Sequence, residues 1–314
     1  MSRHILIDGG QSGCRIVYVA NGERIMVGAG AGLGRQDPDR TEGLLRVLES
    51  TFEDMAPRIP DTVDVVAAGL TGFDGSSEAA RAIADGVRKR VRTARVVVTD
   101  DAVTSYLGAI GFEPGVVVAA GTGVIALAGD REGNVARSDG WGYILGDDGS
   151  GYYIGRRGLA SALRSHDGRG GSEELLRRAK EVFGAPGSLK DQVYTSSNPA
   201  GEVAKFAREV AEAARGGDVA ASEIWAIAAR EVAQTATAAL DQVFTPGTSV
   251  TVSWTGNLFE AGDLMLQPFQ RQVAVMWPAA RLLTPKGAAL DGAELLARSH
   301  APHMFEDLLH VFES

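Results

Sequence analysis

Two stretches of this chain repeat the same order of structural signals, and this repeat limits the folds that the chain can adopt. In each stretch an apolar strand ends in a glycine-rich turn and a second strand follows. The first covers residues 4–20, with its turn starting at Gly9 and Gly10, and the second covers residues 116–128, with the turn Gly121-Thr122-Gly123. The repeat predicts a chain built as two α/β domains of one design.

The length and composition of the chain agree with two domains. A chain of 314 residues with 45% hydrophobic residues can bury a large core, and chains of this size favour two domains over one. A linker at residues 111–115 separates the halves, so we expect a first domain at residues 1–112 and a second at residues 113–294. We expect a C-terminal helix at residues 295–314 to pack back on the first domain.

Charge and cysteine content exclude several classes of partner. The formal net charge of −9 argues against nucleic acid and anionic membrane, because both bind proteins through a basic face. No apolar run reaches transmembrane length and no signal pattern opens the chain, so we expect a cytoplasmic protein. Cys14 is the one cysteine, which excludes an intramolecular disulfide and a cysteine-rich zinc site. Any metal ion is therefore expected on oxygen ligands.

The first half continues with helices and buried strands. Helices are predicted at residues 41–55 and 77–92, and strands at residues 63–70 and 94–99. The last of these strands brings Asp100 and Asp101 to its carboxyl end, where open α/β sheets bind ligands. Aspartate is also a favoured N-cap, so one of the pair is expected to cap the following helix.

The second half is mainly helical after its first strands. Residues 172–217 read as helical and charged, and residues 219–244 as one long alanine-rich helix. A late strand at residues 249–254 ends in the turn Thr255-Gly256-Asn257, and a closing helix begins near residue 286. We expect the turn at Gly256 to face a nucleotide.

The segment from Gly140 to Tyr153 carries the strongest chemical signal. It combines glycines, which let a ligand approach the backbone, with aspartates that accept hydrogen bonds from hydroxyls and a tryptophan that can cover a sugar ring. The nearby turn Gly121-Thr122-Gly123 has amide groups suited to a phosphate. A sugar site beside a phosphate site predicts a sugar kinase. A structural reading is also open, in which Trp141 is a core aromatic and Tyr152 and Tyr153 only pack.

These motifs resemble the BadF/BadG/BcrA/BcrD family, and in particular its N-acetylglucosamine kinase branch. The resemblance rests on Gly121-Thr122-Gly123, on residues 140–150 and on Asp101-Ala102, and it extends over nearly the whole chain. It implies two duplicated ribonuclease H-like domains of the actin-like ATPase type, with ATP and the sugar in a central cleft. It also implies a homodimer.

The resemblance further implies a role for individual residues. Asp8 would orient hydrated magnesium, and Asp101 would accept the proton of the attacking sugar hydroxyl. The nucleotide contacts would be Asp8, Gly9, Gly10, Gln11, Ser12, Gly121, Thr122, Gly123, Gly256 and Asn257. The sugar contacts would be Asp101, Gly140, Trp141, Gly142, Asp147 and Gln36. Magnesium suits a site of this kind because it keeps several waters and needs one or two carboxylates.

The chain departs from the family pattern in its first phosphate loop and in its sugar loop. Ser12 stands where threonine is usual, and Gly13 where lysine or arginine commonly follows. Residues 30–36 lack the asparagine with which the N-acetylglucosamine kinases contact the sugar, and Gln36 or Arg35 could replace it. The resemblance therefore predicts an ATP-dependent kinase of the C6 hydroxyl of N-acetylglucosamine, with glucosamine or another hexose derivative as alternatives.

Two other classes of function are alternatives to the kinase. An activator of a radical enzyme, known in the same family, holds an iron–sulfur cluster on about four thiolates. Two copies of a chain whose one cysteine is Cys14 offer only two. A sugar-binding regulator without catalysis is the more distant alternative, and the presence of both Asp8 and Asp101 argues for turnover instead.

Overall fold

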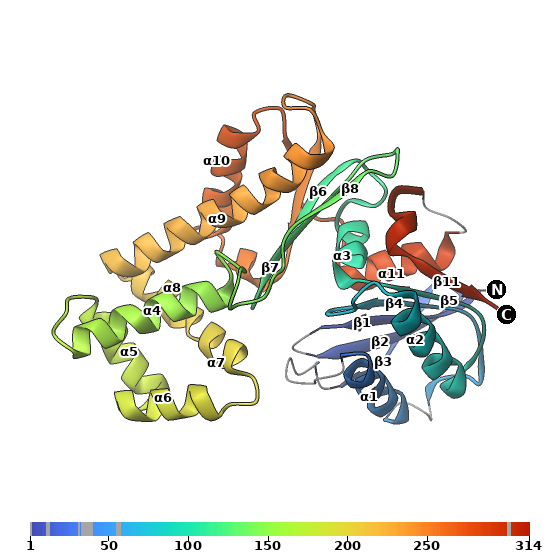
Figure 1. Cartoon of the computed structure of the whole chain (residues 1–314), viewed down its shortest axis with the longest axis horizontal. Helices are drawn as coiled ribbons and strands as arrows, with labels where there is room; N and C mark the ends of the chain where they lie inside the picture. The colour runs from blue at the N-terminus through green and yellow to red at the C-terminus, as the bar shows by residue number, and fades with distance from the viewer. Residues whose placement is uncertain (1, 11–12, 31, 33–39, 55–57, 300–302) are drawn as a thin grey trace. The chain divides into compact units, whose positions relative to one another are not determined.

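The computed structural model describes residues 2–10, 13–30, 32, 40–54, 58–299 and 303–314 (Figure 1). The chain forms two compact units. Unit 1 consists of Met1–Pro114, Gly129–Val135 and Thr284–Ser314, and unit 2 of Gly115–Ala128 and Ala136–Leu283. The predicted limits at residues 1–112 and 113–294 differ from these units, because Gly129–Val135 and the segment after Leu283 both belong to unit 1.

Unit 1 is built on a sheet with the strand order β11-β5-β4-β1-β2-β3. The bounds are β1 (Arg3–Gly9), β2 (Cys14–Ala20), β3 (Glu23–Gly30), β4 (Thr62–Leu70), β5 (Arg92–Thr99) and β11 (His310–Glu313). β1 runs antiparallel to β2 and parallel to β4, and β5 is parallel to β4. β1, β4 and β5 therefore end at the same edge of the sheet.

The predicted hairpin at the start of the chain is confirmed. Residues 3–9 pair with residues 14–20, with Asp8 opposite Arg15. The next turn has Asn21 at φ 54° and Gly22 at φ 81°, the left-handed backbone that favours asparagine and glycine in tight hairpins. That turn leads into β3, an edge strand which the sequence reading did not predict.

Helices cover both faces of this sheet (Figure 1). α1 (Arg40–Glu53) and α2 (Ser77–Arg90) lie on one face, and α3 (Asp101–Ile110) and α11 (Ala289–Arg298) on the other. The core under α1 and α2 is formed by the inward side chains of alternating strand residues, among them Ile5, Ile7, Ile16 and Val66. Cys14 lies in this core, and burial raises the pKa of its thiol to about 11.

α3 and α11 approach each other closely because glycines lie at their contact. A Cβ atom on Gly108 of α3 would lie 2.0 Å from the carbonyl oxygen of Ala288. A Cβ atom on Gly292 of α11 would lie 1.9 Å from the carbonyl oxygen of Thr104. α11 is also fixed at its start, where Asp291 accepts a hydrogen bond from the backbone N–H of Ala288 at 2.6 Å. This contact sets the position of α3, and α3 begins with Asp101.

Unit 2 is built on a second sheet with the strand order β10-β9-β6-β7-β8. The bounds are β6 (Gly115–Ala120), β7 (Val124–Gly129), β8 (Val135–Asp139), β9 (Thr251–Thr255) and β10 (Arg281–Leu282). β6 is parallel to β9, with Ala119 opposite Thr255. The turns that follow these two strands therefore lie at one edge of the sheet.

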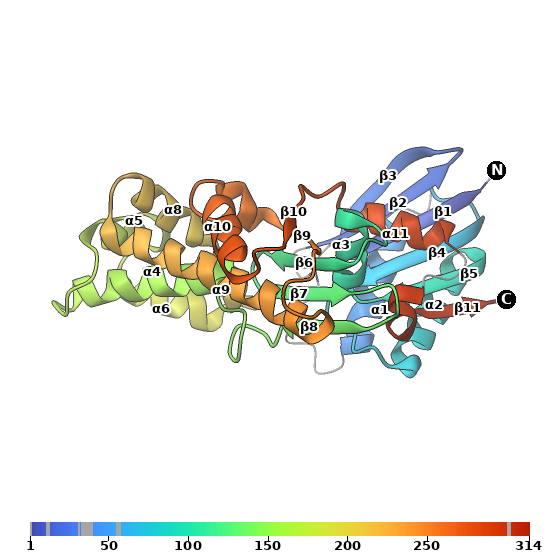
Figure 2. The same ribbon diagram turned by 90° about the horizontal axis from the view of Figure 1, so that it is seen from above.

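A large helical layer accompanies this sheet. Its helices are α4 (Gly151–His166), α5 (Glu173–Phe183), α6 (Pro186–Thr195), α7 (Pro199–Lys205), α8 (Ala207–Arg215), α9 (Val219–Val243) and α10 (Leu266–Met276). α4 and α9 run side by side (Figures 1 and 2). The long predicted helix is confirmed as α9, and the helical reading of residues 172–217 as α5 to α8. α4 and α10 were not predicted.

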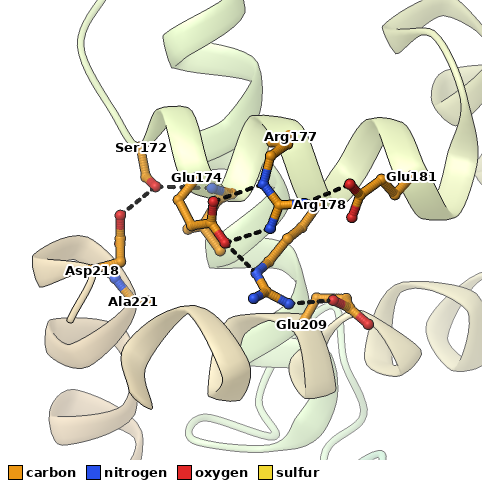
Figure 3. Close-up of polar contacts among 9 residues, drawn as sticks. Ser172, Glu174, Arg177, Arg178, Glu181, Glu209, Asp218 and Ala221 are labelled. Atoms are coloured by element: carbon orange, nitrogen blue, oxygen red, sulfur yellow. Dashed lines mark hydrogen bonds and ion pairs between the residues drawn. The ribbon is translucent and has the colours of Figure 1, made fainter. Parts of the chain in front are cut away.

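Polar contacts join three of these helices (Figure 3). The hydroxyl of Ser172 caps α5 and also donates a hydrogen bond to Asp218 at 2.6 Å, while Asp218 caps α9. Arg178 of α5 binds Glu174 on its own helix and Glu209 on α8. Hydrogen bonds from Arg177 and Arg178 lower the pKa of Glu174 to about 2. The ion pairs of this network are partly exposed and add little to the free energy of unfolding, whereas Ser172 is buried.

The C-terminal segment corrects one prediction. Residues 295–314 do not form a single helix, because α11 ends at Arg298, a short 3-10 segment follows at His303–Leu308, and the chain ends in β11. β11 pairs antiparallel with β5 and thereby gives the edge of that sheet its missing hydrogen bonds. Within the described ranges, no helix combines the length and the apolar character needed to cross a membrane.

We predict that Gly108→Ala destabilises unit 1 by about 1–3 kcal/mol, because the added methyl group meets a backbone carbonyl that cannot move without separating α3 from α11. The free energy of unfolding in urea measures the loss. Gly187→Ala is the matched control, since a Cβ atom on Gly187 meets nothing within 4 Å. Equal stability of the two variants would contradict the role given to the glycine contact.

Candidate active site

Asp8 lies at the carboxyl end of β1, where the chain leaves the sheet. Its side chain is buried and its carboxylate pairs with the guanidinium of Arg15 on the neighbouring strand. The turn after it is held by a hydrogen bond from the N–H of Gly10 to the carbonyl of Gly13 at 2.8 Å. Gly9 accepts a hydrogen bond from the N–H of Thr71 at 2.7 Å, which ties the turn to the end of β4.

Arg15 is a charged residue of this site that the sequence reading did not select. The register of β1 and β2 places it directly opposite Asp8, and 54% of its side chain is exposed. Arg3 on β1 and Arg24 on β3 pair with residues 20 and 19, at the opposite end of β2. Arg15 therefore provides a positive charge beside a loop in which Gly13 has no side chain. The predicted hairpin pairs the end of its first strand with the start of its second, so the sequence could have placed Arg15 opposite Asp8.

Asp100 and Asp101 have different structural roles. Asp100 caps α3, because its carboxylate accepts a hydrogen bond from the N–H of Ala102 at 2.8 Å. Asp101 begins the helix, and its carboxylate accepts a hydrogen bond from the hydroxyl of Thr71 at the end of β4. The expectation that one of the two caps the helix is confirmed, and the cap is Asp100.

The surroundings of Asp101 keep its proton bound more tightly than usual. Burial raises its pKa to about 8, and the negative charges of Asp100 and Asp8 act in the same direction, while the hydrogen bond from Thr71 opposes them. A carboxyl group of this kind can take up a proton near neutral pH, whereas an ordinary aspartate holds one only in acid. Perturbed carboxyl groups of this kind are characteristic of functional sites.

The donor atoms near Asp8 fit a hydrated magnesium ion better than a protein-built metal cage. Across the part of the chain that the structure describes, no group of three or more histidine, cysteine, aspartate or glutamate side chains is arranged to hold a metal. Magnesium needs only one or two carboxylates when it keeps its waters. Asp8 supplies one such carboxylate, and a metal ion there would compete with Arg15 for it.

In unit 2 the turn Gly121-Thr122-Gly123 connects β6 to β7 and is held on both sides. The N–H of Gly121 donates to the carbonyl of Gly123, and the N–H of Gly151 donates to the carbonyl of Gly121 at 2.7 Å. Asp147 is 3% exposed, and its carboxylate accepts a hydrogen bond from the N–H of Val124 at 3.2 Å. A Cβ atom on Gly123 would lie 2.8 Å from this carboxylate, so the glycine is required by the contact.

The segment from Asp139 to Ser150 is a closed loop with an exposed tip. Asp139 accepts hydrogen bonds from the N–H groups of Asp147 and Asp148, at 2.8 and 3.2 Å. Asp139 and Asp147 both adopt positive φ, at 61° and 60°, which is uncommon for residues other than glycine. Trp141 at the tip is 76% exposed, so it is not a core aromatic.

The turn at Gly256 lies against the end of β6. Gly256 has φ 99°, and a Cβ atom on it would lie 2.2 Å from the carbonyl oxygen of Ala120. The side-chain oxygen of Asn257 lies 3.5 Å from the position of a Cβ atom on Gly121. The structure thus brings together two turns that are far apart in the sequence, as expected at the carboxyl ends of adjacent parallel strands.

The predicted site residues fall into two groups, one in each unit. Unit 1 brings together Asp8, Gly9, Gly10 and Asp101, and unit 2 brings together Gly121, Thr122, Gly123, Asp147, Gly256 and Asn257. Gly140, Trp141 and Gly142 lie on the loop that Asp139 anchors. Gln11, Ser12 and Gln36 lie outside the described residues.

Kinases of amino sugars are among the known proteins that are similar to this chain. An N-acetylmuramic acid/N-acetylglucosamine kinase from Clostridium acetobutylicum is 26% identical over 297 residues, which are 93% of this chain and 97% of that protein. The structure of a proposed N-acetylglucosamine kinase from Chromobacterium violaceum matches with a TM-score of 0.74 and 26% identity, covering 95% of this chain and 99% of that one.

A more distant structure shares the fold. A ROK family glucokinase from Streptomyces griseus, in complex with glucose and AMPPNP, matches with a TM-score of 0.62 at 20% identity, covering 95% of this chain and 99% of that one. The sequence profile of the BadF/BadG/BcrA/BcrD ATPase family matches residues 7–297. The chain belongs to the BadF/BadG/BcrA/BcrD ATPase family.

Proposed function

We propose that this protein is an ATP-dependent kinase that transfers the γ-phosphate of ATP to the C6 hydroxyl of an amino sugar, N-acetylglucosamine. The observation that carries the proposal is Asp101, a carboxylate with a raised pKa at the carboxyl end of β5, next to Thr71 and within electrostatic reach of Asp8. The names of two relatives that cover nearly the whole chain support the choice of substrate. Glucosamine and other hexose derivatives are the alternative substrates.

In the proposed reaction Asp101 is the general base. Its carboxylate accepts the proton of the sugar hydroxyl as the oxygen bonds to the γ-phosphorus and the bond to the bridging oxygen of ADP breaks. The hydrogen bond from Thr71 fixes the orientation of the carboxylate. Because the transition state is loose, positioning of the hydroxyl contributes more than the strength of the base.

The glycine turns are the proposed phosphate and nucleotide contacts. Gly9 and Gly10 in unit 1 and Gly121 to Gly123 in unit 2 leave the backbone open to the phosphate oxygens, since no side chain blocks it. Gly256 and Asn257 are proposed to contact the adenosine. Magnesium, held through water by Asp8, would screen the charge of the phosphates. Arg15 adds a positive charge at the first of these turns.

The remaining contacts are proposed for the sugar. Gly140, Trp141, Gly142 and Asp147 belong to one loop, and Gln36 completes the set on the sequence pattern alone. The buried carboxylate of Asp147 supports the loop from within, through Val124. We place the enzyme in the cytoplasm, where ATP is available, and expect it to act as a homodimer.

We predict that Asp101→Asn lowers kcat about 10²- to 10⁴-fold, because the amide cannot accept the proton of the hydroxyl but can still accept the hydrogen bond of Thr71. The measurement is ADP release from ATP and magnesium with N-acetylglucosamine, glucosamine, N-acetylmuramic acid, mannosamine and glucose. We expect the largest kcat/KM for N-acetylglucosamine.

The control for this variant is Asp85→Asn, an exposed position on α2 of the same unit. It removes the same charge and is expected to leave activity unchanged. If no sugar stimulates ADP release by the unaltered enzyme although ATP binds, the kinase proposal is wrong and a binding function takes its place.

We predict that in Asp100→Asn the acid limb of the pH profile of kcat/KM for the sugar moves to lower pH. In the unaltered enzyme the raised pKa of Asp101 means that kcat/KM for the sugar rises with pH up to a value well above the ordinary aspartate range. The negative charge of Asp100 contributes to this rise, so its removal lowers the pKa of Asp101. The amide oxygen of asparagine keeps the cap on α3. An unchanged acid limb would show that Asp101 is not the titrating group.

We predict that Arg15→Gln weakens binding of ATP with magnesium about 10- to 100-fold, the usual range for a lost charge-assisted hydrogen bond. Calorimetric titration with ATP and magnesium measures the effect without turnover. Arg3→Gln, on β1 at the opposite end of the same hairpin, is the matched control and is expected to keep the original affinity. Equal affinities of Arg15→Gln and the unaltered protein would remove Arg15 from the site.

A further inference from the structure

The carboxylate of Asp147 lies against the turn Gly121-Thr122-Gly123 in the interior of unit 2. The side chain is 3% exposed, and it accepts a buried hydrogen bond from the N–H of Val124, the residue that follows the turn. Both carboxylate oxygens and the carbon between them would lie 2.8 to 3.0 Å from a Cβ atom on Gly123, so the whole group packs against that glycine. Asp147 therefore contacts the proposed phosphate turn directly.

The start of α4 holds the carbonyl groups of the same turn. The N–H of Gly151 donates to the carbonyl of Gly121 at 2.7 Å, and the N–H of Tyr152 donates to the carbonyl of Thr122 at 3.2 Å. Both N–H groups belong to the first turn of a helix, where the helix itself provides no acceptor for them, so the phosphate turn supplies the acceptors. The two carbonyl groups are thus directed toward α4.

This arrangement decides where the N–H groups of the turn point. In a trans peptide group the C=O of one residue and the N–H of the next point in opposite directions. The N–H groups of Thr122 and Gly123 share their peptide groups with the two carbonyls bound to α4, so they point away from that helix. Two successive N–H groups on one side of a turn suit the oxygen atoms of a phosphate.

The backbone of Asp147 is held in an uncommon conformation. Its φ of 60° lies in the left-handed region, which glycine adopts freely and which is uncommon for residues with a side chain. The carboxylate of Asp139 accepts a hydrogen bond from the N–H of Asp147 at 2.8 Å, and the N–H of Ser150, the cap of α4, donates to the carbonyl of Asp147 at 3.1 Å. A residue held in this region from both sides at a proposed ligand site indicates a functional constraint.

We infer that Asp147 is a positioning residue for ATP, because it holds the turn Gly121-Thr122-Gly123 in the conformation that offers two N–H groups to a phosphate. The inference rests on the proposed function, in which this turn contacts the nucleotide. It gives the side chain of Asp147 a role other than the sugar contact proposed above. Loss of the carboxylate is therefore expected to weaken the binding of ATP even where no sugar is present.

The test measures ATP and sugar separately on the full chain. Calorimetric titration with ATP and magnesium in the absence of sugar gives the nucleotide affinity, and KM for N-acetylglucosamine at saturating ATP reports on the sugar. In Asp147→Gly we expect ATP to bind about 10-fold more weakly, because the buried N–H of Val124 loses its acceptor. We expect KM for the sugar to stay within about threefold, less than the loss of one substrate contact costs. Glycine is chosen because it adopts the φ of Asp147 without strain.

Two further variants separate the hydrogen bond from other causes. Asp147→Asn keeps an oxygen acceptor for Val124 and tolerates positive φ, so we expect it to bind ATP within about threefold of the unaltered protein. Asp148→Gly is the matched control, because it removes an exposed carboxylate and adds a glycine at the next position of the same loop. It is expected to leave the affinity for ATP unchanged. If Asp148→Gly weakens ATP binding as much as Asp147→Gly does, flexibility of the loop explains both and the inference is wrong.

Gly123→Ala tests the same contact with the carboxylate in place. The added methyl group meets the carboxylate of Asp147 and displaces it, so we expect ATP to bind more weakly. In the double variant that combines Gly123→Ala with Asp147→Gly this space is open, so the two losses are expected not to add. Additive losses would show that the two changes act independently, which overturns the inference.

The results also distinguish this inference from the proposed function. If Asp147→Gly binds ATP as tightly as the unaltered protein but has a raised KM for the sugar, the inference is overturned and the kinase proposal stands, with Asp147 as a sugar contact. Absence of ATP binding by the unaltered protein overturns the kinase proposal and this inference with it.

Discussion

The negative charge gathered at the carboxyl edge of the unit 1 sheet is the constraint on which the proposed chemistry depends. Asp8, Asp100 and Asp101 lie near one another because β1 and β5 end at the same edge, and only β4 lies between them. Burial raises the pKa of Asp101, and the negative charges of Asp100 and Asp8 raise it further. Arg15 pairs with Asp8, and Asp100 caps the start of α3.

A cation that joins this edge changes the balance. The positive charge of a hydrated magnesium ion near Asp8 would offset the field that raises the pKa of Asp101 and so favour its ionised, basic form. The same ion would compete with Arg15 for the carboxylate of Asp8. Arg15 is half in solvent on a flexible side chain, so it can leave Asp8 and follow a phosphate instead. Metal and nucleotide would thus act on the proposed base through charge, while burial, the largest cause of its raised pKa, would remain.

The strands and their turns could be predicted from the sequence because their signals are local. Alternating and continuous apolar runs identified β1, β2, β4, β5, β6, β7 and β9, and the glycines after β1, β6 and β9 identified the turns. Asp100 and Asp101 were found because they follow a buried strand directly. The sequence also predicted that one of the two would cap the following helix, but the local pattern did not show which one. That choice depends on Thr71, which lies 30 residues away.

Other elements depend on partners that a local pattern does not contain. β11 has four residues and is a strand because it pairs with the edge of β5. This pairing is not visible in the local sequence, and the segment was therefore wrongly predicted to be helical. α4 begins within the glycine-rich segment that was read as a ligand loop, and its apolar face is defined by α5, α7 and α9. Arg15 was not predicted as a site residue because its position beside Asp8 depends on the register between β1 and β2. The carboxylate of Asp147 was expected to face a ligand, and its backbone contact with Val124 could not be read from spacing.

The division between core and loop explains how relatives of low identity can share the fold while their substrates differ. The turns at Gly123 and Gly256 are fixed by contacts in which a Cβ atom would meet a carboxylate or a carbonyl, so they change little without loss of the fold. In the loop after β8, Gly146 is fixed in the same way by the carboxylate of Asp139, but Trp141, Ile144 and Leu145 have side chains that face solvent. Substitutions of these exposed side chains cost little stability. Under the proposed function, selectivity for the sugar can therefore change at this tip while the proposed phosphate turns stay unchanged.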